Sequence, residues 1–170
     1  MERWDKYFLD ICETVASNSK CLSRKIGAII VRDKSIISTG YNGSPRGIPY
    51  CGSERFKVDA DLRNTMIIIH SDRIMDKICP RRLMGFESGE GLEWCIASHA
   101  ERNAIVNAAR NGIKVKGAKM YMNCGIPCCE CLKEIINVGI EEIICTNLEY
   151  YDRMTSFLLQ NSGIKFRRFE

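Results

Sequence analysis

The chain has 170 residues, of which 45% are hydrophobic and 27% are charged, which predicts one compact domain and excludes a disordered chain. Its longest apolar runs fall far short of the ~20 residues that a membrane span needs. The first residues carry no secretory or transit pattern, so we expect a cytoplasmic protein. The net charge of +4, with no run of like charge longer than two residues, lacks the dense basic stripe of many polynucleotide-binding domains and suits a small anionic ligand as well.

The first half of the chain predicts a helix, a hairpin and an insertion. Apolar residues recur every three or four positions over 4–15, which is typical of an amphipathic helix. Two apolar runs, 26–31 and 36–41, predict a β-hairpin that is followed by a turn-rich loop at 42–47. Residues 66–78 have a helical pattern inside a segment, about 51–97, that is too long for a plain connection. We expect this insertion to be functional or held by a metal.

The second half alternates between helices and strands. Helices are predicted at 99–109, 128–138 and 151–160, and strands at 119–124, 142–146 and 164–169. This alternation favours an α/β fold with helices on both faces of a sheet.

Ten cysteines are the unusual feature of the composition. Without an export signal, clustered cysteines indicate metal binding rather than disulfide bonds. Three of them lie in apolar stretches and are expected to be small buried residues, namely Cys12, Cys124 and Cys145.

The sharpest motif pairs His99-Ala100-Glu101 with Pro127-Cys128-Cys129-Glu130-Cys131. Cys128 and Cys131 are three positions apart, so on a helix they share a face and can bind one ion together. With a nitrogen from His99 they make three ligands, the number that leaves a catalytic zinc ion an open position for water. Each ligand cluster lies at a predicted helix start, where the helix dipole favours a thiolate. Glu101 is then placed to move protons without binding the metal.

Two structural interpretations stand beside this one. Ser98 and Glu101 also have the spacing of a capping box, in which the glutamate only closes the helix start. The Cys-x-x-Cys pair taken alone fits a redox pair or half of a structural zinc site. The two motifs together form the H-x-E…P-C-x-x-C signature of zinc nucleobase deaminases.

The chain resembles the cytidine deaminase superfamily in this pair of motifs, and it resembles the deoxycytidylate (dCMP) deaminases in the loop 40–45, Gly-Tyr-Asn-Gly-Ser-Pro. The resemblance runs from about Trp4 to the end of the chain and includes the blocks 25–28 and 99–105. It implies one domain over residues 1–170, with the insertion at about 51–97. The implied fold is a three-layer α/β/α sandwich around a five-stranded mixed sheet.

The implied reaction is the hydrolytic deamination of dCMP to dUMP, which supplies the precursor for thymidylate synthesis. In this interpretation His99, Cys128 and Cys131 hold zinc, while Glu101 takes a proton from water and passes protons to the ring and to the leaving amine. The resemblance also implies that Asn42 binds the sugar, although the residue fits a left-handed turn nearly as well. Arg24 and Tyr151 are candidates for the phosphate, with a solvated surface role as the alternative for Arg24.

A second, structural zinc ion is a further implication of the resemblance. Its ligands would be Cys21 and Cys51, completed by Cys79, Cys95 or His70 from the insertion. The alternative for His70 is a core histidine.

Members of the family are commonly hexamers that dCTP activates and dTTP inhibits. The glycine-containing loop at 43–47 is a candidate cradle for the triphosphate. The expected effector residues are Gly43, Ser44, Arg46 and Arg110.

Two other functions remain open on the sequence. A polynucleotide deaminase acting on tRNA or single-stranded DNA would share the zinc ligands, but the 8% aromatic content and the scattered basic residues disfavour it. A zinc-stabilised binding module without catalysis would leave Glu101 unexplained.

Overall fold

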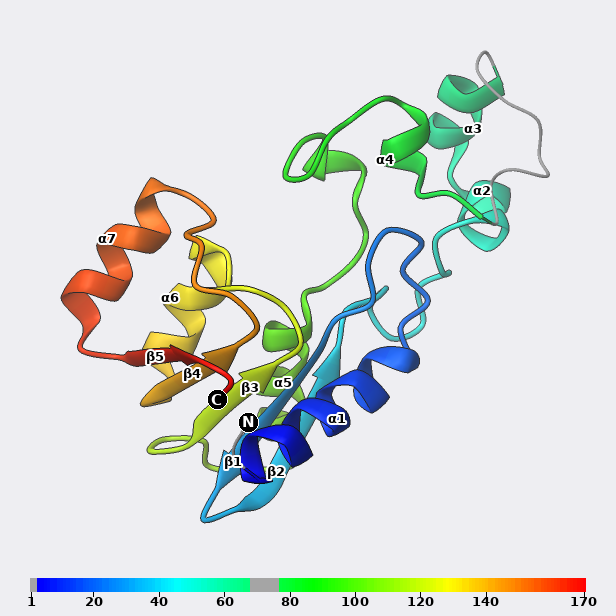
Figure 1. Ribbon diagram of the computed structural model, residues 1–170. Coiled ribbons are helices and arrows are strands. Elements are labelled where there is room, and N and C mark those ends of the chain that lie inside the picture. The colour runs from blue at the N-terminus through cyan, green and yellow to red at the C-terminus, as the bar shows by residue number, and fades with distance from the viewer. Residues whose placement is uncertain (1–2, 68–76) are drawn as a thin grey trace. The chain divides into compact units, whose positions relative to one another are not determined.

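The computed structural model describes residues 3–67 and 77–170 (Figure 1). The chain divides into two compact units. The first unit comprises Met1–Ser19, Ile26–Asn42 and His99–Glu170, and the second comprises Lys20–Lys25 and Gly43–Ser98. The second unit thus contains the expected insertion, whose boundaries stay a prediction.

The first unit is built on a five-stranded mixed sheet with the strand order β2-β1-β3-β4-β5. The strands are β1 (Gly27–Arg32), β2 (Ser35–Tyr41), β3 (Lys119–Met122), β4 (Glu142–Cys145) and β5 (Lys165–Arg168). β1 is antiparallel to both β2 and β3, whereas β3, β4 and β5 run parallel. The predicted hairpin is confirmed: its two turn residues, Asp33 and Lys34, have φ values of 50° and 60°, as a tight two-residue turn requires.

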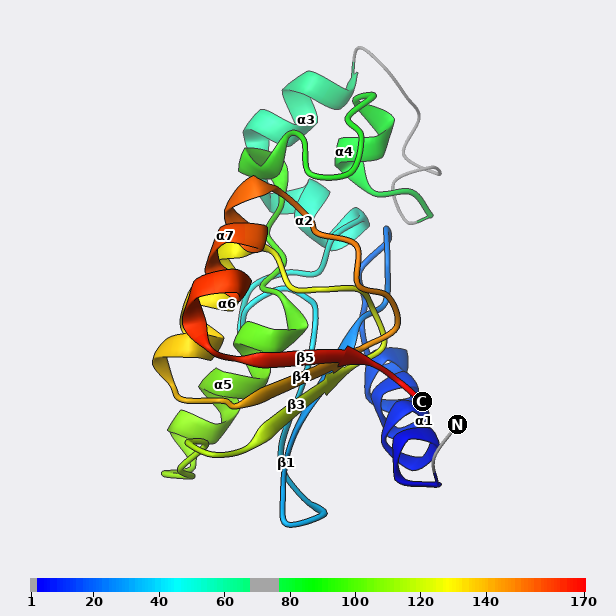
Figure 2. The same cartoon turned by 60° about the vertical axis from the view of Figure 1, so that its left-hand side comes forward.

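Helices cover both faces of this sheet (Figure 2). The helix α1 (Arg3–Ser17) covers one face, while α5 (Ala100–Arg110), α6 (Cys129–Asn137) and α7 (Arg153–Ser162) cover the other. Alternate residues of β1 explain the two layers, since Ile29 packs in the α1 cluster and Ile30 in the cluster with α5, α6 and α7. The predicted three-layer α/β/α fold is confirmed, and the six elements expected in the second half are all present.

The three cysteines expected to be buried are buried to different degrees. Cys12 and Cys145 are fully buried, and Cys124 is half-buried against the larger cluster. All ten cysteines are free thiols.

The contact between β2 and α5 is unusually close. A Cβ atom on Gly40 would lie 2.2 Å from the backbone nitrogen of Ala104 and 2.4 Å from the carbonyl oxygen of Ala100. Two asparagines of α5 also bond to the outer edge of β2: Asn103 Nδ2 donates to the carbonyl of Tyr41 at 2.7 Å, and Asn107 Nδ2 to that of Thr39 at 2.8 Å. Glycine on the strand and alanines on the helix therefore fix where α5 begins.

The second unit contains short helices around a small core. They are α2 (Ser53–Val58), α3 (Ala60–Ile67), α4 (Pro80–Leu83) and the 3-10 helix η2 (Leu92–Trp94). Leu62 and Met66 are buried and pack against partly buried side chains that include Trp94. The helix α3 begins at Ala60, where the carboxylate of Asp59 accepts the backbone N–H of Leu62 at 2.9 Å and caps the first turn, and it overlaps the helix expected at 66–78 only in residues 66–67. Residues 68–76 of that expected helix lie outside the described residues.

Within 3–67 and 77–170, no helix has the length and apolar character needed to cross a membrane.

Candidate metal and catalytic site

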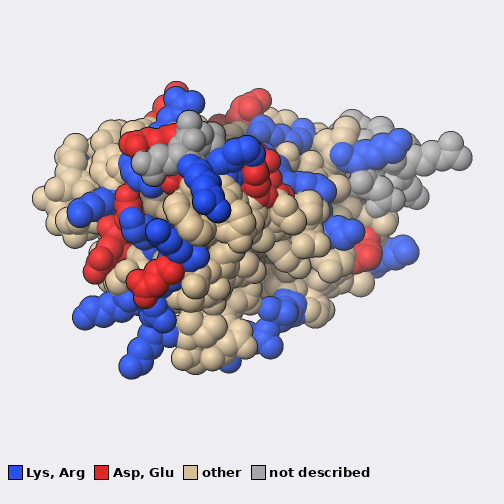
Figure 3. All heavy atoms as spheres, turned by 60° about the horizontal axis from the view of Figure 1, so that its bottom comes forward, with Lys and Arg blue, Asp and Glu red and all other residues tan. Residues whose placement is uncertain are grey.

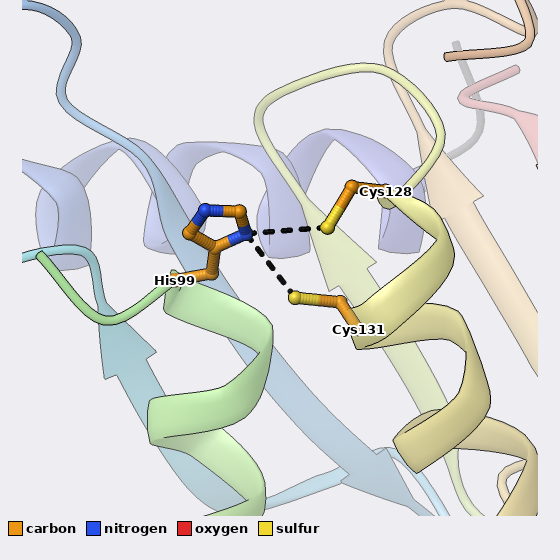
Figure 4. A group of neighbouring side chains, drawn as sticks. All are labelled: His99, Cys128 and Cys131. Carbon is orange, nitrogen blue, oxygen red and sulfur yellow. Dashed lines mark hydrogen bonds between the residues drawn. The ribbon is translucent and has the colours of Figure 1, made fainter. Parts of the chain in front are cut away.

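Three side chains from two helix starts converge in the first unit (Figure 4). His99 is the N-cap residue of α5 and Cys128 is the N-cap residue of α6, with Cys131 in the first turn of α6. The Nδ1 atom of His99 lies 3.5 Å from Sγ of Cys128 and 3.3 Å from Sγ of Cys131. Among the residues that the structure describes, this is the one group of three His, Cys, Asp or Glu side chains whose ligand atoms all lie within 4.8 Å of one another.

The spacing of these atoms fits tetrahedral zinc. Zinc binds sulfur at about 2.3 Å and histidine nitrogen at about 2.0 Å, so a nitrogen and a sulfur ligand at the tetrahedral angle are separated by about 3.5 Å. The two observed separations, 3.5 Å and 3.3 Å, are close to this value. The donors also suit the metal, since two thiolates and an imidazole are typical zinc ligands. The residues predicted to bind zinc are therefore brought together.

The electrostatics of the group favour a deprotonated sulfur. A hydrogen bond from Cys131 lowers the pKa of the Cys128 thiol to about 4, and the His99 imidazole acts in the same direction. The same shared proton, together with burial, raises the pKa of Cys131. Hydrogen bonding to Cys128 raises the pKa of His99. The arrangement thus favours a thiolate on Cys128, the form in which cysteine binds a metal ion.

Glu101 lies in the first turn of α5, two residues after His99, and only 5% of its surface is exposed. Burial raises the pKa of its carboxyl group. The capping-box interpretation is wrong, because the N-cap residue of α5 is His99 rather than Ser98. The carboxyl group of Glu101 accepts the backbone N–H of its own residue, and a buried carboxyl group beside a metal ligand is suited to carry protons.

Asn42 lies at the end of β2 and is 7% exposed. Its Oδ1 atom accepts the backbone N–H of Ile26 at 2.8 Å, and its own N–H donates to the carbonyl of Ile26 at 3.0 Å. It has no positive φ, so the left-handed turn interpretation is wrong. The side chain instead fixes the strand entry, and its predicted contact with the sugar stays a prediction.

The other predicted residues are more scattered. Tyr151 is exposed in the segment before α7. Arg110 ends α5, about 17 Å along the helix axis from His99 at 1.5 Å per residue. The remaining expected substrate and effector residues belong to the second unit, and they are Arg24, Gly43, Ser44 and Arg46.

Four cysteines of the second unit line one small cavity of about 40 Å³, as predicted ligands of a second metal would. They are Cys21, Cys51, Cys79 and Cys95. Burial raises the pKa of Cys51 to about 11, and Cys79 and Cys95 add to this rise as nearby negative charges. No three of these four sulfur atoms lie within 4.8 Å of one another, so they are less tightly gathered than the His99 group. His70 lies outside the described residues.

The sequence did not indicate an ion pair beside the site. Arg102, directly after Glu101, binds Glu134 on α6 with its Nε atom 2.9 Å from Oε1 and 3.1 Å from Oε2. Pairs between two helices have no spacing signal in a single sequence, unlike i,i+4 pairs within one helix.

Comparisons with known proteins agree with this site. Residues 2–147 match the family model described as the cytidine and deoxycytidylate deaminase zinc-binding region. The deoxycytidylate deaminase of Enterobacteria phage T2 is 36% identical over 168 residues, which cover 92% of this chain and 87% of that protein.

The deoxycytidylate deaminase of Schizosaccharomyces pombe is 30% identical over 98% of this chain. The chain spans less than half the length of this relative and of its Saccharomyces cerevisiae counterpart, at 44% and 45%. Among solved structures, the dCMP deaminase of the cyanophage S-TIM5 in apo form is similar in fold, with a TM-score of 0.65, 21% identity and 99% of both chains covered. On its matched motifs, its fold and its His-Cys-Cys group, this chain belongs to the cytidine and deoxycytidylate deaminase zinc-binding family.

Proposed function

We propose that this protein is a zinc-dependent hydrolase that converts dCMP and water to dUMP and ammonia. The observation that carries the proposal is the His99, Cys128 and Cys131 group, with the buried carboxyl group of Glu101 two residues from His99. Several relatives bear the name deoxycytidylate deaminase. The cyanophage S-TIM5 enzyme, similar in fold, has been solved in complex with dCMP and dUMP.

The mechanism divides the work between the metal and one carboxyl group. His99, Cys128 and Cys131 would hold a zinc ion, and the ion would supply the Lewis acidity that activates water near neutral pH. Glu101 receives the proton of that water and delivers protons to N3 of the ring and to the departing amine. Its burial keeps solvent from exchanging those protons and raises its pKa towards the value that a proton carrier needs. We assign Asn42 to the sugar, and Tyr151 and Arg24 to the phosphate.

The charge distribution on one face supports a mononucleotide rather than a polynucleotide as the substrate. On the face drawn in Figure 3, the Lys and Arg side chains are interspersed with Asp and Glu and do not form one continuous stripe. A long nucleic acid contacts many phosphates and so favours a continuous basic track.

The test is ammonia release by zinc-loaded protein offered dCMP, deoxycytidine, dCTP and a cytosine-containing oligonucleotide in parallel. We expect turnover of dCMP alone. Preference for the oligonucleotide would contradict the proposal and favour a polynucleotide deaminase. No release from any of the four, with zinc bound and with dCTP also tested as an activator, would identify a zinc-stabilised binding module.

We further propose the family's assembly and regulation for this chain, namely a homo-hexamer in the cytoplasm that dCTP activates and dTTP inhibits. Residues 43–47 contain a tight turn in which the N–H of Ile48 donates to the carbonyl of Pro45 at 3.1 Å, with Gly47 at φ 78°. Such turns present backbone N–H groups that suit phosphates, and we assign Gly43, Ser44, Arg46 and Arg110 to the effector. Unchanged dCMP turnover on addition of either triphosphate would remove this part of the proposal.

A second zinc ion in the second unit is the last part of the proposal. Its ligands would be the four thiols around the small cavity, Cys21, Cys51, Cys79 and Cys95. The donor set supports a structural site, since four cysteines close the coordination of zinc and leave no position for water.

The zinc content of the purified protein tests this second site. We expect two zinc ions per chain in the wild type and one in Cys51→Ser, because the substitution removes a ligand of the structural site alone. Cys12→Ser, on the buried face of α1, is the matched control and should keep both ions. A wild-type ratio near one would reject the second ion.

A further inference from the structure

The ion pair between Arg102 and Glu134 joins the two helices that carry the metal ligands. Besides the two contacts of Nε, the Nη2 atom of Arg102 lies 2.8 Å from Oε1 of Glu134. A guanidinium that meets a carboxylate through two nitrogens fixes direction as well as distance. The pair therefore sets α5 and α6 in one orientation, which apolar packing between the helices does not do by itself.

The pair stands one helical turn from the ligands on both helices. Glu134 follows Cys131 by three residues on α6, so the two side chains share a face of that helix. Arg102 follows His99 by three residues on α5. A change in the angle or slide between the helices at the ion pair is thus carried directly to the distances between His99 and the two sulfur atoms.

The ion pair between Arg102 and Glu134 adds little to the stability of the fold. The two side chains are 42% and 38% exposed, and exposed ion pairs contribute little to the free energy of unfolding. The apolar contacts of the larger core cluster, including Leu132 and Ile135 of α6, hold the helices on the sheet without it.

We propose that Arg102 is a positioning residue of the zinc site: held by Glu134, it fixes α5 against α6 and thereby slows the loss of zinc. This inference rests on the zinc site of the proposed function and not on the identity of the substrate.

The experiment is the rate of zinc transfer from the loaded full-length protein to a coloured chelator. A Cys131→Ala variant, which lacks the site, identifies the phase of zinc release that belongs to it. We expect Arg102→Met to release zinc about 10- to 100-fold faster in that phase, the usual effect of losing a partner of the ligands. Glu134→Gln should also speed zinc release. The release rate of Arg102→Lys should lie between those of the wild type and Arg102→Met, because lysine keeps the positive charge but cannot contact the carboxylate through two nitrogens.

The matched control is Lys6→Met, which breaks the exposed ion pair with Asp10 on α1, across the sheet from the site. It should release zinc at the wild-type rate. Circular dichroism checks that each metal-free variant is folded, and if Arg102→Met is not, Glu134→Gln decides the result. Release from these variants at no more than about twice the wild-type rate would overturn the inference. A wild type that keeps its zinc but releases no ammonia from dCMP would overturn the proposed function alone.

Discussion

At the scale of single residues, metal binding depends on side chains at the starts of two helices that make no capping hydrogen bond. His99 and Cys128 occupy the N-cap positions of α5 and α6, yet neither caps its helix through its side chain. The imidazole and the thiol are therefore available to a metal, next to backbone N–H groups that favour a thiolate. Glu101, two residues after His99, keeps a buried carboxyl group in the same helix turn, and we propose that this group transfers protons.

Glu101→Gln separates proton transfer from metal binding. The amide keeps the size of the side chain but cannot accept and return a proton, so we expect ammonia release from dCMP to fall by at least about 100-fold while zinc content is unchanged. The measurement is initial rate together with zinc per chain. Glu13→Gln, the same change at an exposed position of α1, is the control and should keep the wild-type rate. Turnover by Glu101→Gln near the control rate would exclude the assigned role.

The metal ligands could be predicted from the sequence because their spacing is itself the signal. Cys128 and Cys131 must share a helix face whatever the rest of the chain does. The contacts of Asn42 and Arg102, in contrast, could not be predicted from the sequence. The bond from Ile26 to Asn42 and the ion pair from Arg102 to Glu134 both join segments whose approach is set by the tertiary fold. No local pattern encodes that approach.

At the scale of elements, one contact without side chains decides where α5 lies. Gly40 on β2 faces the backbone of Ala100 and Ala104, and each residue lacks the bulk that would hold strand and helix apart. Since His99 and Glu101 lie at the start of α5, this contact sets the height of both proposed functional side chains above the sheet.

Gly40→Ala should therefore weaken both the fold and the site. Its Cβ atom would lie 2.2 Å from a backbone nitrogen, so α5 must move, and we expect a loss of about 3 kcal/mol in the free energy of unfolding. Urea denaturation measures this loss. Gly112→Ala has open space around its Cβ and is strained only by its φ of 64°, so it should cost about 1 kcal/mol. Equal losses in the two variants would contradict the crowding argument.

Helices and strands alternate in the second half of the chain, and this pattern let the sequence predict each element to within a few residues of its observed ends. The insertion was harder to interpret for a physical reason. Its core in the described residues is small, centred on Leu62 and Met66, and its helices are short. Short helices lack the repeated apolar face on which such predictions depend, and the cap provided by Asp59 gave an earlier start than the apolar pattern suggested.

At the scale of the whole chain, a buried carboxylate ties the beginning of the sequence to its end. Asp5 on α1 is 1% exposed, and its two oxygens accept from Arg167 on β5 at 2.6 and 3.0 Å. The same carboxylate accepts the backbone N–H of Glu170 at 2.9 Å. These bonds hold the edge strand β5 to the helix α1. Arg167 also forms an ion pair with Glu142.

This link makes stability depend on pH in the acid range. Hydrogen bonding to Arg167 lowers the pKa of Asp5 from its ordinary value of 3.8, so its contribution is complete above that value and is lost as pH falls through the lower folded pKa. We expect Asp5→Asn to lose about 2 to 3 kcal/mol at pH 7 and to lose less than the wild type on further acidification. Urea denaturation from pH 7 to pH 2.5 measures both effects.

Asp10→Asn is the control for this pH dependence, because its carboxylate is exposed and pairs only with Lys6 on the same helix in the described contacts. Its loss should stay below about 0.5 kcal/mol at pH 7. Parallel pH profiles for Asp5→Asn and the wild type would assign the acid sensitivity to other groups.

The bonds from α5 to β2 have a consequence for how copies of this chain can meet. β2 is an edge strand, and an open edge invites a strand from another molecule to add to the sheet. Here the outward carbonyl groups of Thr39 and Tyr41 already accept from Asn107 and Asn103. A strand from another molecule could not hydrogen-bond to these two carbonyl groups unless it displaced α5, the helix that carries His99 and Glu101 at its start. The bonds that hold α5 in place therefore also protect this edge against strand-by-strand aggregation.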